Sequence, residues 1–491
     1  MLPPAAYHQA RSAFGRACTC IDNIMLKNPR MNGFVYLRNT DTIRDECKNP
    51  ENHAYGRPLA GRLVGLKDNF CTTDMPTTCA SKMLHDYRSP YESTPSQLLR
   101  DAGAVIVGKV NMDEFAMGTH NLHSSYGKCL NPLFPLEDEV SPGGSSGGSA
   151  AVVAADMCDI ALGSDTGGSV RLPAAYCGVV GYKPSYGLIS RHGVIAYAQS
   201  LDTVGILAKN VADVENTFNV LNHYDDKDPT SLAPEFRKRI HAMKASRNVE
   251  KLRIGIVQEA IIDLSPQVRD AWINSLEYMR GLGHEVVVVS VPSLRNSLPT
   301  YFIVSPAEAS SNLARYDGVR YGYRHEDDRD GDNLYAPTKT EGFGSEVQRR
   351  ILLGTYNLSA GAYGNHYEKA QKVRRCIQKE FDDIFSVPNV LHDSPDNVDS
   401  SEAQSVTVDV LIQPTTRTIA PTFKQVSEAK NATDAYINDV LTVPANLAGL
   451  PAISVPWGHG IESVGIQVIG QFGDDQLVLD VAKILETGNK L

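Results

Sequence analysis

Two short segments rich in glycine and serine hold the residue types that acyl-transfer chemistry needs. The first reads SPGGSSGGS over residues 141–149, and the second reads GSDTGGSVR over residues 163–171. Successive backbone N–H groups in such a turn can hold the negative charge that develops on an attacked carbonyl oxygen. The second segment therefore predicts a serine nucleophile at Ser169, with an oxyanion hole formed by the N–H groups of Thr166, Gly167, Gly168 and Ser169.

Other interpretations of these segments have to be weighed against a catalytic one. A flexible linker is excluded because the segments are separated by apolar runs at 150–155 and 160–162, which indicate a helix and a strand. A phosphate-binding loop lacks its usual patterns, since neither GxxxxGK[ST] nor GxGxxG occurs there. Two tight turns in a buried sheet stay an open alternative to an active site.

Lys67 is the candidate base that a serine nucleophile requires. It follows the apolar run LVGL at 63–66, which predicts a buried strand that ends at the lysine. Burial disfavours the ammonium form, so a buried lysine can be neutral and accept a proton. The carboxyl ends of strands are where α/β proteins place their sites. His120 and His123 lie in a polar stretch without a carboxylate partner in view, so we do not expect a Ser-His pair.

The elements that would position these residues alternate between helix and strand. The capping pair Ser93 and Thr94 predicts a helix over 95–101, and residues 104–110 form an apolar strand. A strand at 252–257, a helix after Ser265 and a β-branched strand at 284–291 predict parallel pairing with a right-handed crossover. Near the end of the chain we expect two strands and a helix, at 452–456, 464–469 and 476–485.

Composition limits the class of protein further. The 491 residues are 42% hydrophobic and 21% charged, which is typical of a soluble globular protein and argues against a disordered chain or a coiled coil. The net charge of −10 argues against non-specific binding to nucleic acid by the whole surface. The nine cysteines lack the CxxC spacing of a zinc site, so we expect reduced thiols and no metal. No apolar stretch is long enough to cross a bilayer.

The two segments, together with GLKDN at 65–69, closely resemble the amidase signature family. The resemblance implies an α/β fold in which a central mixed β-sheet is covered by helices on both faces. It implies a single large domain over 1–491, with a catalytic core at about 60–210, an α/β and helical part at about 211–440, and strands and a helix at 441–491. It also implies a triad of the nucleophile Ser169, the relay Ser145 and the base Lys67, with a cis bond between Gly144 and Ser145.

Further stretches resemble one branch of that family, the glutamine-hydrolysing components of tRNA-dependent amidotransferases. They are KVNMDEFAMG at 109–118, EASSNLARYDGVRYG at 308–322, RRILLGT at 349–355 and ANLAGLP at 445–451. The resemblance implies that Arg350 and Asp439 recognise free glutamine. Arg350 would bind its α-carboxylate, and Asp439 would bind its α-ammonium. Phe302 departs from the pattern, because the family commonly has a tyrosine there that helps to hold glutamine. Whether Tyr301 replaces that hydroxyl is left open by the sequence.

The resemblance implies a glutaminase that releases ammonia for the conversion of Glu-tRNA(Gln) to Gln-tRNA(Gln). The partners would be a B subunit that carries the tRNA and uses ATP and Mg, and a small third subunit; this chain would need no cofactor. The alternatives are a free-standing amidase that acts on aryl or acyl amides and an inactive scaffold subunit. The family points to the mitochondrial matrix, and otherwise to the cytoplasm. Arg11 and Arg16 precede the first acidic residue as in an organellar presequence, although an ordinary first helix is equally consistent.

Overall fold

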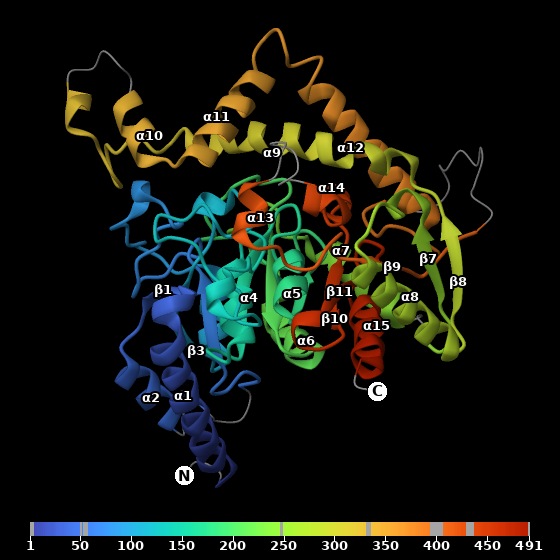
Figure 1. Ribbon diagram of the computed structural model, residues 1–491, viewed down its shortest axis with the longest axis horizontal. Coiled ribbons are helices and arrows are strands. Elements are labelled where there is room, and N and C mark those ends of the chain that lie inside the picture. The colour runs from blue at the N-terminus through green and yellow to red at the C-terminus, as the bar shows by residue number, and fades with distance from the viewer. Residues whose placement is uncertain are drawn as a thin grey trace.

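One mixed β-sheet runs through the protein (Figure 1). The computed structural model describes residues 4–49, 52, 57–245, 249–329, 335–392, 406–428 and 437–489. Within these residues eleven strands pair in the order β1-β3-β2-β4-β6-β5-β10-β11-β9-β7-β8. The strands are β1 (Phe34–Leu37), β2 (Leu63–Lys67), β3 (Val105–Val110), β4 (Ile160–Asp165), β5 (Val180–Lys183), β6 (Thr203–Ala208), β7 (Arg253–Val257), β8 (Glu285–Val289), β9 (Val410–Pro414), β10 (Ala452–Trp457) and β11 (Val464–Gly470).

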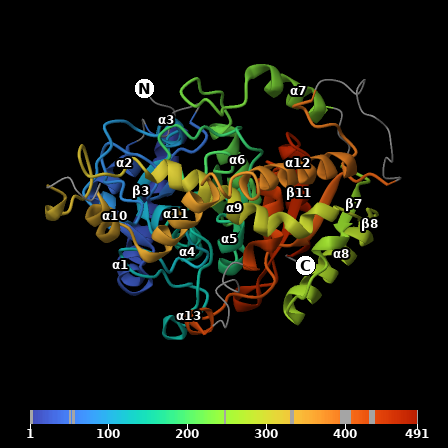
Figure 2. The ribbon, with the colours of Figure 1, turned by 90° about the horizontal axis from the view of Figure 1, so that it is seen from above.

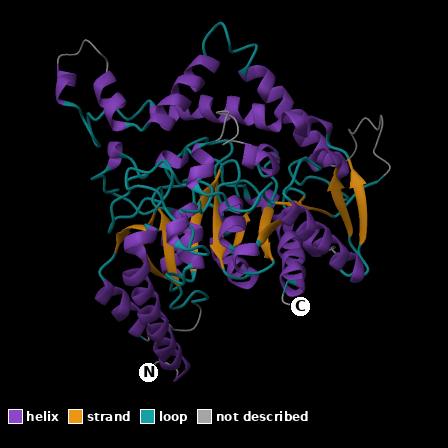
Figure 3. Cartoon of the chain, viewed as in Figure 1, coloured by secondary structure: helices purple, strands orange, loops and turns teal. Residues whose placement is uncertain are grey.

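Helices cover both faces of the sheet, and a further helical layer lies above the ends of its strands (Figure 3). The helices are α1 (Pro4–Met31), α2 (Thr40–Lys48), α3 (Thr94–Asp101), α4 (Gly147–Ala154), α5 (Arg171–Cys177), α6 (Val211–Leu221), α7 (Pro234–Ala245), α8 (Pro266–Gly281), α9 (Ser297–Leu313), α10 (Ala336–Gly342), α11 (Ser345–Asn357), α12 (Tyr367–Ile384), α13 (Phe423–Ser427), α14 (Val443–Leu447) and α15 (Asp475–Gly488). Seen from above, α3 and α6 lie on one side of the sheet and α4 and α5 on the other (Figure 2). The predicted fold class is confirmed.

The alternation of side chains along β2 decides where Lys67 points. Leu63 belongs to the core that includes α1 and α4, whereas Val64 and Leu66 belong to the core on the opposite face. Successive side chains of a strand point to opposite faces, so Lys67 shares the face of Leu63. That face is the one that α4 covers. The strand therefore delivers the lysine to the start of α4, where the first glycine and serine segment ends.

The predicted strand, helix, strand unit is confirmed. β7 pairs with β8 in parallel, with Arg253 opposite Glu285. Between them lies α8, the helix predicted after Ser265, which buries an apolar stripe of Val268, Trp272, Leu276 and Met279. A helix with one apolar face must bury that face, and here it packs on β8, β9 and β11.

The last two strands of the chain occupy the middle of the sheet. β10 and β11 form an antiparallel hairpin in which Ala452 lies opposite Ile469. β10 also pairs with β5, and β11 pairs with β9. The hairpin thus joins the strands of the first half of the chain to those of the second half. All described strands belong to one sheet, and the boundaries within the single predicted domain stay a prediction.

The N-terminal helix and the helical layer complete the structure. α1 buries Ala13, Ala17, Ile21 and Ile24 in the core that also holds Leu63 and Val105 of the sheet, so the stretch with Arg11 and Arg16 is part of a packed helix. α9 and α11 pack on one another across the top of the view in Figure 1, and α9 also contacts α14. Within the described ranges, no helix is sufficiently long and apolar to cross a membrane.

Candidate active site

The three predicted triad residues meet at the carboxyl ends of β2 and β4. Lys67 is the last residue of β2, and Ser169 lies in the turn between β4 and α5. The two strands are parallel neighbours, with Leu66 opposite Leu162, so both end at the same edge of the sheet. Ser145 lies in the turn that leads into α4. Lys67 and Ser145 are fully buried, and Ser169 is half-buried, so the predicted nucleophile is the most accessible of the three.

The side-chain nitrogen of Lys67 is surrounded by serine hydroxyls. Nζ lies 2.8 Å from Ser145 Oγ and 2.9 Å from both Ser146 Oγ and Ser164 Oγ. Sequence reasoning missed Ser146 and Ser164, although both are in the two segments. Their hydroxyls fix the lysine head beside Ser145.

Burial lowers the pKa of Lys67 to about 7, even though the negative charges of Asp113, Asp165 and Asp202 act in the opposite direction. A large fraction of this lysine is therefore neutral near pH 7. A neutral amine has a lone pair, and the lone pair can take a proton from the hydroxyl of Ser145.

The contact between the two serines runs through the backbone. The N–H of Ser145 donates to Ser169 Oγ at 3.3 Å. The expected cis bond between Gly144 and Ser145 is wrong for this structure, because the peptide bonds among the described residues are all trans. The chain reverses instead through left-handed backbone at Gly143 and Gly144, whose φ angles are 78° and 57°. Glycine adopts that conformation without a steric penalty, and this turn brings Ser145 to both Lys67 and Ser169.

The backbone N–H of Gly168 does not fit the oxyanion hole that the sequence predicted. It donates to Asp165 Oδ1 at 2.8 Å, so a buried carboxylate takes the place of the substrate oxygen. Asp165 Oδ2 accepts hydrogen bonds from the backbone N–H groups that follow, among them that of Val170 at 3.1 Å. The N–H groups of Thr166, Gly167 and Ser169 stay predicted as the oxyanion donors.

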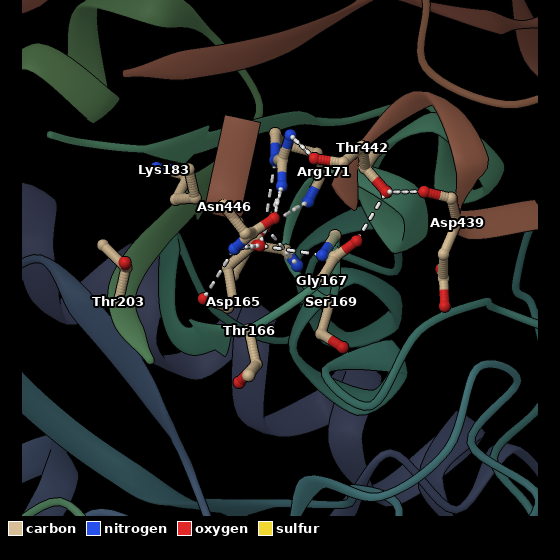
Figure 4. A network of polar contacts seen from close by, with 12 residues as sticks. Asp165, Thr166, Gly167, Ser169, Arg171, Lys183, Thr203, Asp439, Thr442 and Asn446 are labelled. Atoms are coloured by element: carbon tan, nitrogen blue, oxygen red, sulfur yellow. Dashed lines mark hydrogen bonds and ion pairs between the residues drawn. The ribbon is translucent and has the colours of Figure 1, made fainter. Parts of the chain in front are cut away.

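Asp165 is the centre of a buried polar network around Arg171 (Figure 4). A guanidinium has five N–H donors, and Arg171 uses all of them. The acceptors are Asp165 Oδ1 and Oδ2, Thr442 O, Gln467 Oε1 and Asn446 Oδ1, at 2.6 to 3.1 Å. Burial is the largest single effect and raises the pKa of Asp165, but the charge and hydrogen bonds of Arg171, the charge of Lys183 and the hydrogen bond from Asn446 together lower it to about 2. The network therefore holds the nucleophile turn through the buried ion pair of Arg171 and Asp165.

Arg350 lies on α11 and points into the interior, where its guanidinium is held by two partners. Nε donates to Glu346 Oε1 at 2.8 Å, and Nη1 donates to the hydroxyl of Tyr197 at 2.7 Å. The ring of Phe302 lies 5.9 Å from the guanidinium carbon. Glu346 and Tyr197 were not singled out from the sequence. Their contacts show that Arg350 takes part in a structural ion pair within α11, and this pair also fixes the direction of the guanidinium.

Asp439 lies on a short 3-10 helix, Ile437–Leu441, and is buried. Burial raises the pKa of its carboxyl group to about 8, and the charge of Arg350 opposes this shift. Burial raises the pKa of Tyr301; the charge of Asp439 acts in the same direction and the charge of Arg350 opposes it. The Tyr301 ring lies against the nucleophile turn, because a Cβ on Gly167 would be only 2.8 Å from the Cζ of Tyr301. Tyr301 therefore packs against the turn that carries Ser169, within the electrostatic range of Arg350 and Asp439.

Metal ligands and histidines contribute little to this arrangement. In the part of the chain that the structure describes, no group of three or more His, Cys, Asp or Glu side chains is placed to hold a metal ion. Burial lowers the pKa of His120 to about 4, so its ring is neutral, and Nδ1 lies 3.1 Å from Ser141 Oγ. His120 thus supports the first serine segment.

A buried lysine thus lies among the serine hydroxyls of two glycine-rich segments, an arrangement that is predicted to act as a Ser-Ser-Lys triad. The family model for amidases matches residues 18–479. The chain belongs to the amidase family. It is 48% identical over 467 residues to the A subunit of the mitochondrial glutamyl-tRNA(Gln) amidotransferase of Yarrowia lipolytica, and the match covers 95% of this chain and 98% of that protein.

Two further relatives show the same similarity. The A subunit of the mitochondrial glutamyl-tRNA(Gln) amidotransferase of Emericella nidulans is 50% identical over 451 residues, which are 87% of this chain and 89% of that one. The crystal structure of the corresponding A subunit from the glutamyl-tRNA(Gln) amidotransferase of Thermotoga maritima superimposes with a TM-score of 0.74 at 34% identity. That match covers 99% of this chain and 96% of the other, so the resemblance extends over the complete sheet and the helical layer.

Proposed function

We propose that this chain is the glutamine-hydrolysing A subunit of a mitochondrial glutamyl-tRNA(Gln) amidotransferase. The observation that supports it most directly is a buried cation and a buried carboxyl group, Arg350 and Asp439, whose charges act on one another and on Tyr301, the side chain packed against the Ser169 turn. Free glutamine carries one anionic and one cationic group, and burying either without a partner costs several kcal/mol. The near-full-length similarity to subunits of that name supports the same assignment.

The chemistry follows from the triad. Ser169 Oγ attacks the side-chain carbonyl carbon of glutamine, and its proton passes by way of Ser145 to the neutral amine of Lys67. The N–H groups of the Ser169 turn stabilise the oxyanion. When the C–N bond breaks, the proton returns from Lys67 through Ser145 to the departing nitrogen, and ammonia leaves. Water then cleaves the glutamyl ester at Ser169 and releases glutamate, with the lysine again as base.

Asp439 must be ionised to bind the α-ammonium of glutamine. Its raised pKa means that a large fraction of the carboxyl group is protonated near pH 7 before substrate arrives. An ammonium group at hydrogen-bond distance favours the carboxylate and lowers the pKa again. Glutamine binding at neutral pH is therefore accompanied by the release of a proton from the pocket.

The ammonia has to reach a second protein, which we propose is a B subunit that binds tRNA and activates glutamate with ATP and Mg. A small third subunit would complete the complex, and tRNA would contact this chain only through it. Affinity purification of the tagged chain from mitochondria, followed by mass spectrometry of the co-purifying proteins, tests this assembly. Recovery of the chain alone would contradict it.

Arg350→Ala should raise the KM for glutamine about 10- to 100-fold, because a hydrogen-bonded charge contact contributes about 1.5–3 kcal/mol. Hydrolysis of propionamide, which has no α-carboxylate, should be largely spared. Steady-state kinetics with both substrates measures the difference. Arg349→Ala is the matched control, since Arg349 is exposed and contacts the other oxygen of the same Glu346. Equal losses for both substrates would favour a purely structural ion pair and a free-standing amidase.

A further inference from the structure

Thr442 joins the nucleophile turn to the segment that carries Asp439 (Figure 4). Its hydroxyl lies 2.7 Å from Gly167 O and 3.1 Å from Asp439 O, and its backbone N–H donates to Asp439 O at 3.0 Å. Its own carbonyl oxygen accepts from Arg171 Nη1 at 3.0 Å. One threonine thus contacts the backbone on both sides of the proposed glutamine pocket.

The peptide unit between Gly167 and Gly168 is held at both of its polar ends. Thr442 Oγ1 donates to the carbonyl oxygen, and the N–H donates to Asp165 Oδ1. A fixed peptide plane at this point also sets the directions of the neighbouring N–H groups of Gly167 and Ser169. The approach is close, since a Cβ on Gly168 would lie 2.1 Å from Thr442 Oγ1. These N–H groups are proposed oxyanion donors, and preorganised donors are the ones that stabilise a transition state.

The other side of Thr442 is anchored equally firmly. The carbonyl oxygen of Leu441 accepts from Gln413 Nε2 at 2.8 Å and from Gln467 Nε2 at 3.0 Å. Asn446 Nδ2 donates to Asp165 Oδ1 at 2.9 Å. Buried side-chain amides of β9 and β11 therefore fix the chain around Thr442. The backbone hydrogen bond from Thr442 N–H to Asp439 O in turn fixes the position of Asp439.

We propose that Thr442 is a positioning residue that sets both the oxyanion donors of the Ser169 turn and the location of the Asp439 carboxylate. Because Thr442 contacts both Gly167 O and Asp439 O, it fixes the distance between the site for the amide carbonyl and the site for the α-ammonium of the same substrate. A bound α-ammonium then lies at the distance from the oxyanion donors that glutamine spans. The Asp439 part of this inference rests on the proposed function.

The test uses the chain purified with its partner subunits and measures glutamine and propionamide hydrolysis. Thr442→Val keeps the side-chain volume and removes the hydroxyl. We expect kcat to fall about tenfold for both substrates, less than the 10²- to 10³-fold that follows the loss of an oxyanion donor itself. The KM should rise several-fold for glutamine alone. Thr442→Ser restores the hydroxyl and should recover both parameters, and Thr442→Ala replaces the valine variant if that protein does not fold.

Two controls separate positioning from simple destabilisation. Thr217→Val removes another threonine hydroxyl, which donates to Asp213 O within α6, and should leave kcat and KM unchanged. In an Asp439→Asn background, Thr442→Val should still lower kcat but no longer raise the KM for glutamine. A Thr442→Val enzyme with a lower melting temperature and unchanged kinetics would overturn the proposal, as would failure of Thr442→Ser to recover activity. Failure of the proposed function has a separate signature, because Asp439→Asn alone would then leave the glutamine KM unchanged.

Discussion

Ser169→Ala is expected to abolish amide hydrolysis and to leave the fold intact. The change removes one oxygen from a half-buried residue whose Oγ accepts a single 3.3 Å hydrogen bond from Ser145. Loss of the nucleophile removes the acyl-enzyme route entirely, so kcat should fall by about 10⁴-fold or more. Ammonia release from glutamine, measured in a coupled assay, gives the rate.

The control for this variant is a serine in the other segment. Ser149 is buried in α4 and donates to Leu162 O at 3.0 Å, away from Lys67. Ser149→Ala should keep most of the activity. Mass spectrometry of the wild-type protein quenched during turnover should find a glutamyl ester on Ser169 and none in the Ser169→Ala protein. Near wild-type turnover of Ser169→Ala would remove the triad assignment.

Lys67→Ala should lower kcat by about 10²- to 10⁴-fold, which is the range that general acid-base catalysis contributes. Ser145→Ala should have an effect of the same order, because the proton has to pass through its hydroxyl.

The wild-type enzyme should also show an acidic limb in its pH profile. The pKa of Lys67 is about 7, and only the neutral amine accepts a proton. The rate should therefore rise about tenfold per pH unit below pH 7 and level off above it.

A second buried lysine provides the matched control for that limb. Lys183 is also fully buried and burial lowers its pKa to about 7, but its amine donates to the backbone oxygens of Pro184 and Leu450. Lys183→Met should keep the acidic limb, since Lys183 does not contact the serines, and the residual rate of Lys67→Ala should lose it. Loss of the limb in Lys183→Met together with its retention in Lys67→Ala would contradict the assignment of Lys67 as the base.

Local patterns predicted the elements around the site well. The apolar run at 63–66 indicated a strand that ends at Lys67, and β2 ends there. The helix and strand between the two glycine and serine segments are α4 and β4. Such features depend on neighbouring residues, so periodicity and capping signals reveal them. The roles of the triad and of the glutamine-binding pair stay predictions.

Such local patterns could not predict contacts between segments that are far apart in the sequence. Arg171 was visible only as the last letter of a motif, because its acceptors Gln467 and Asn446 lie in a different part of the chain. The occupation of the Gly168 N–H by Asp165 depends on the detailed shape of one turn. Glu346 precedes Arg350 by one helical turn, a spacing that indicates an ion pair and was available in the sequence.

The central place of β10 and β11 has a consequence for biosynthesis. These strands are made last, yet they pair with β5 on one side and β9 on the other. Until the ribosome has finished residues 452–470, the nascent chain exposes two unpaired strand edges, and such edges are templates for aggregation. A frameshift just before Ala452 would therefore split the sheet into two halves, each with an open edge, even though Lys67, Ser145 and Ser169 are all encoded upstream. The edges of β5 and β9 are covered only once residues 452–470 have been made.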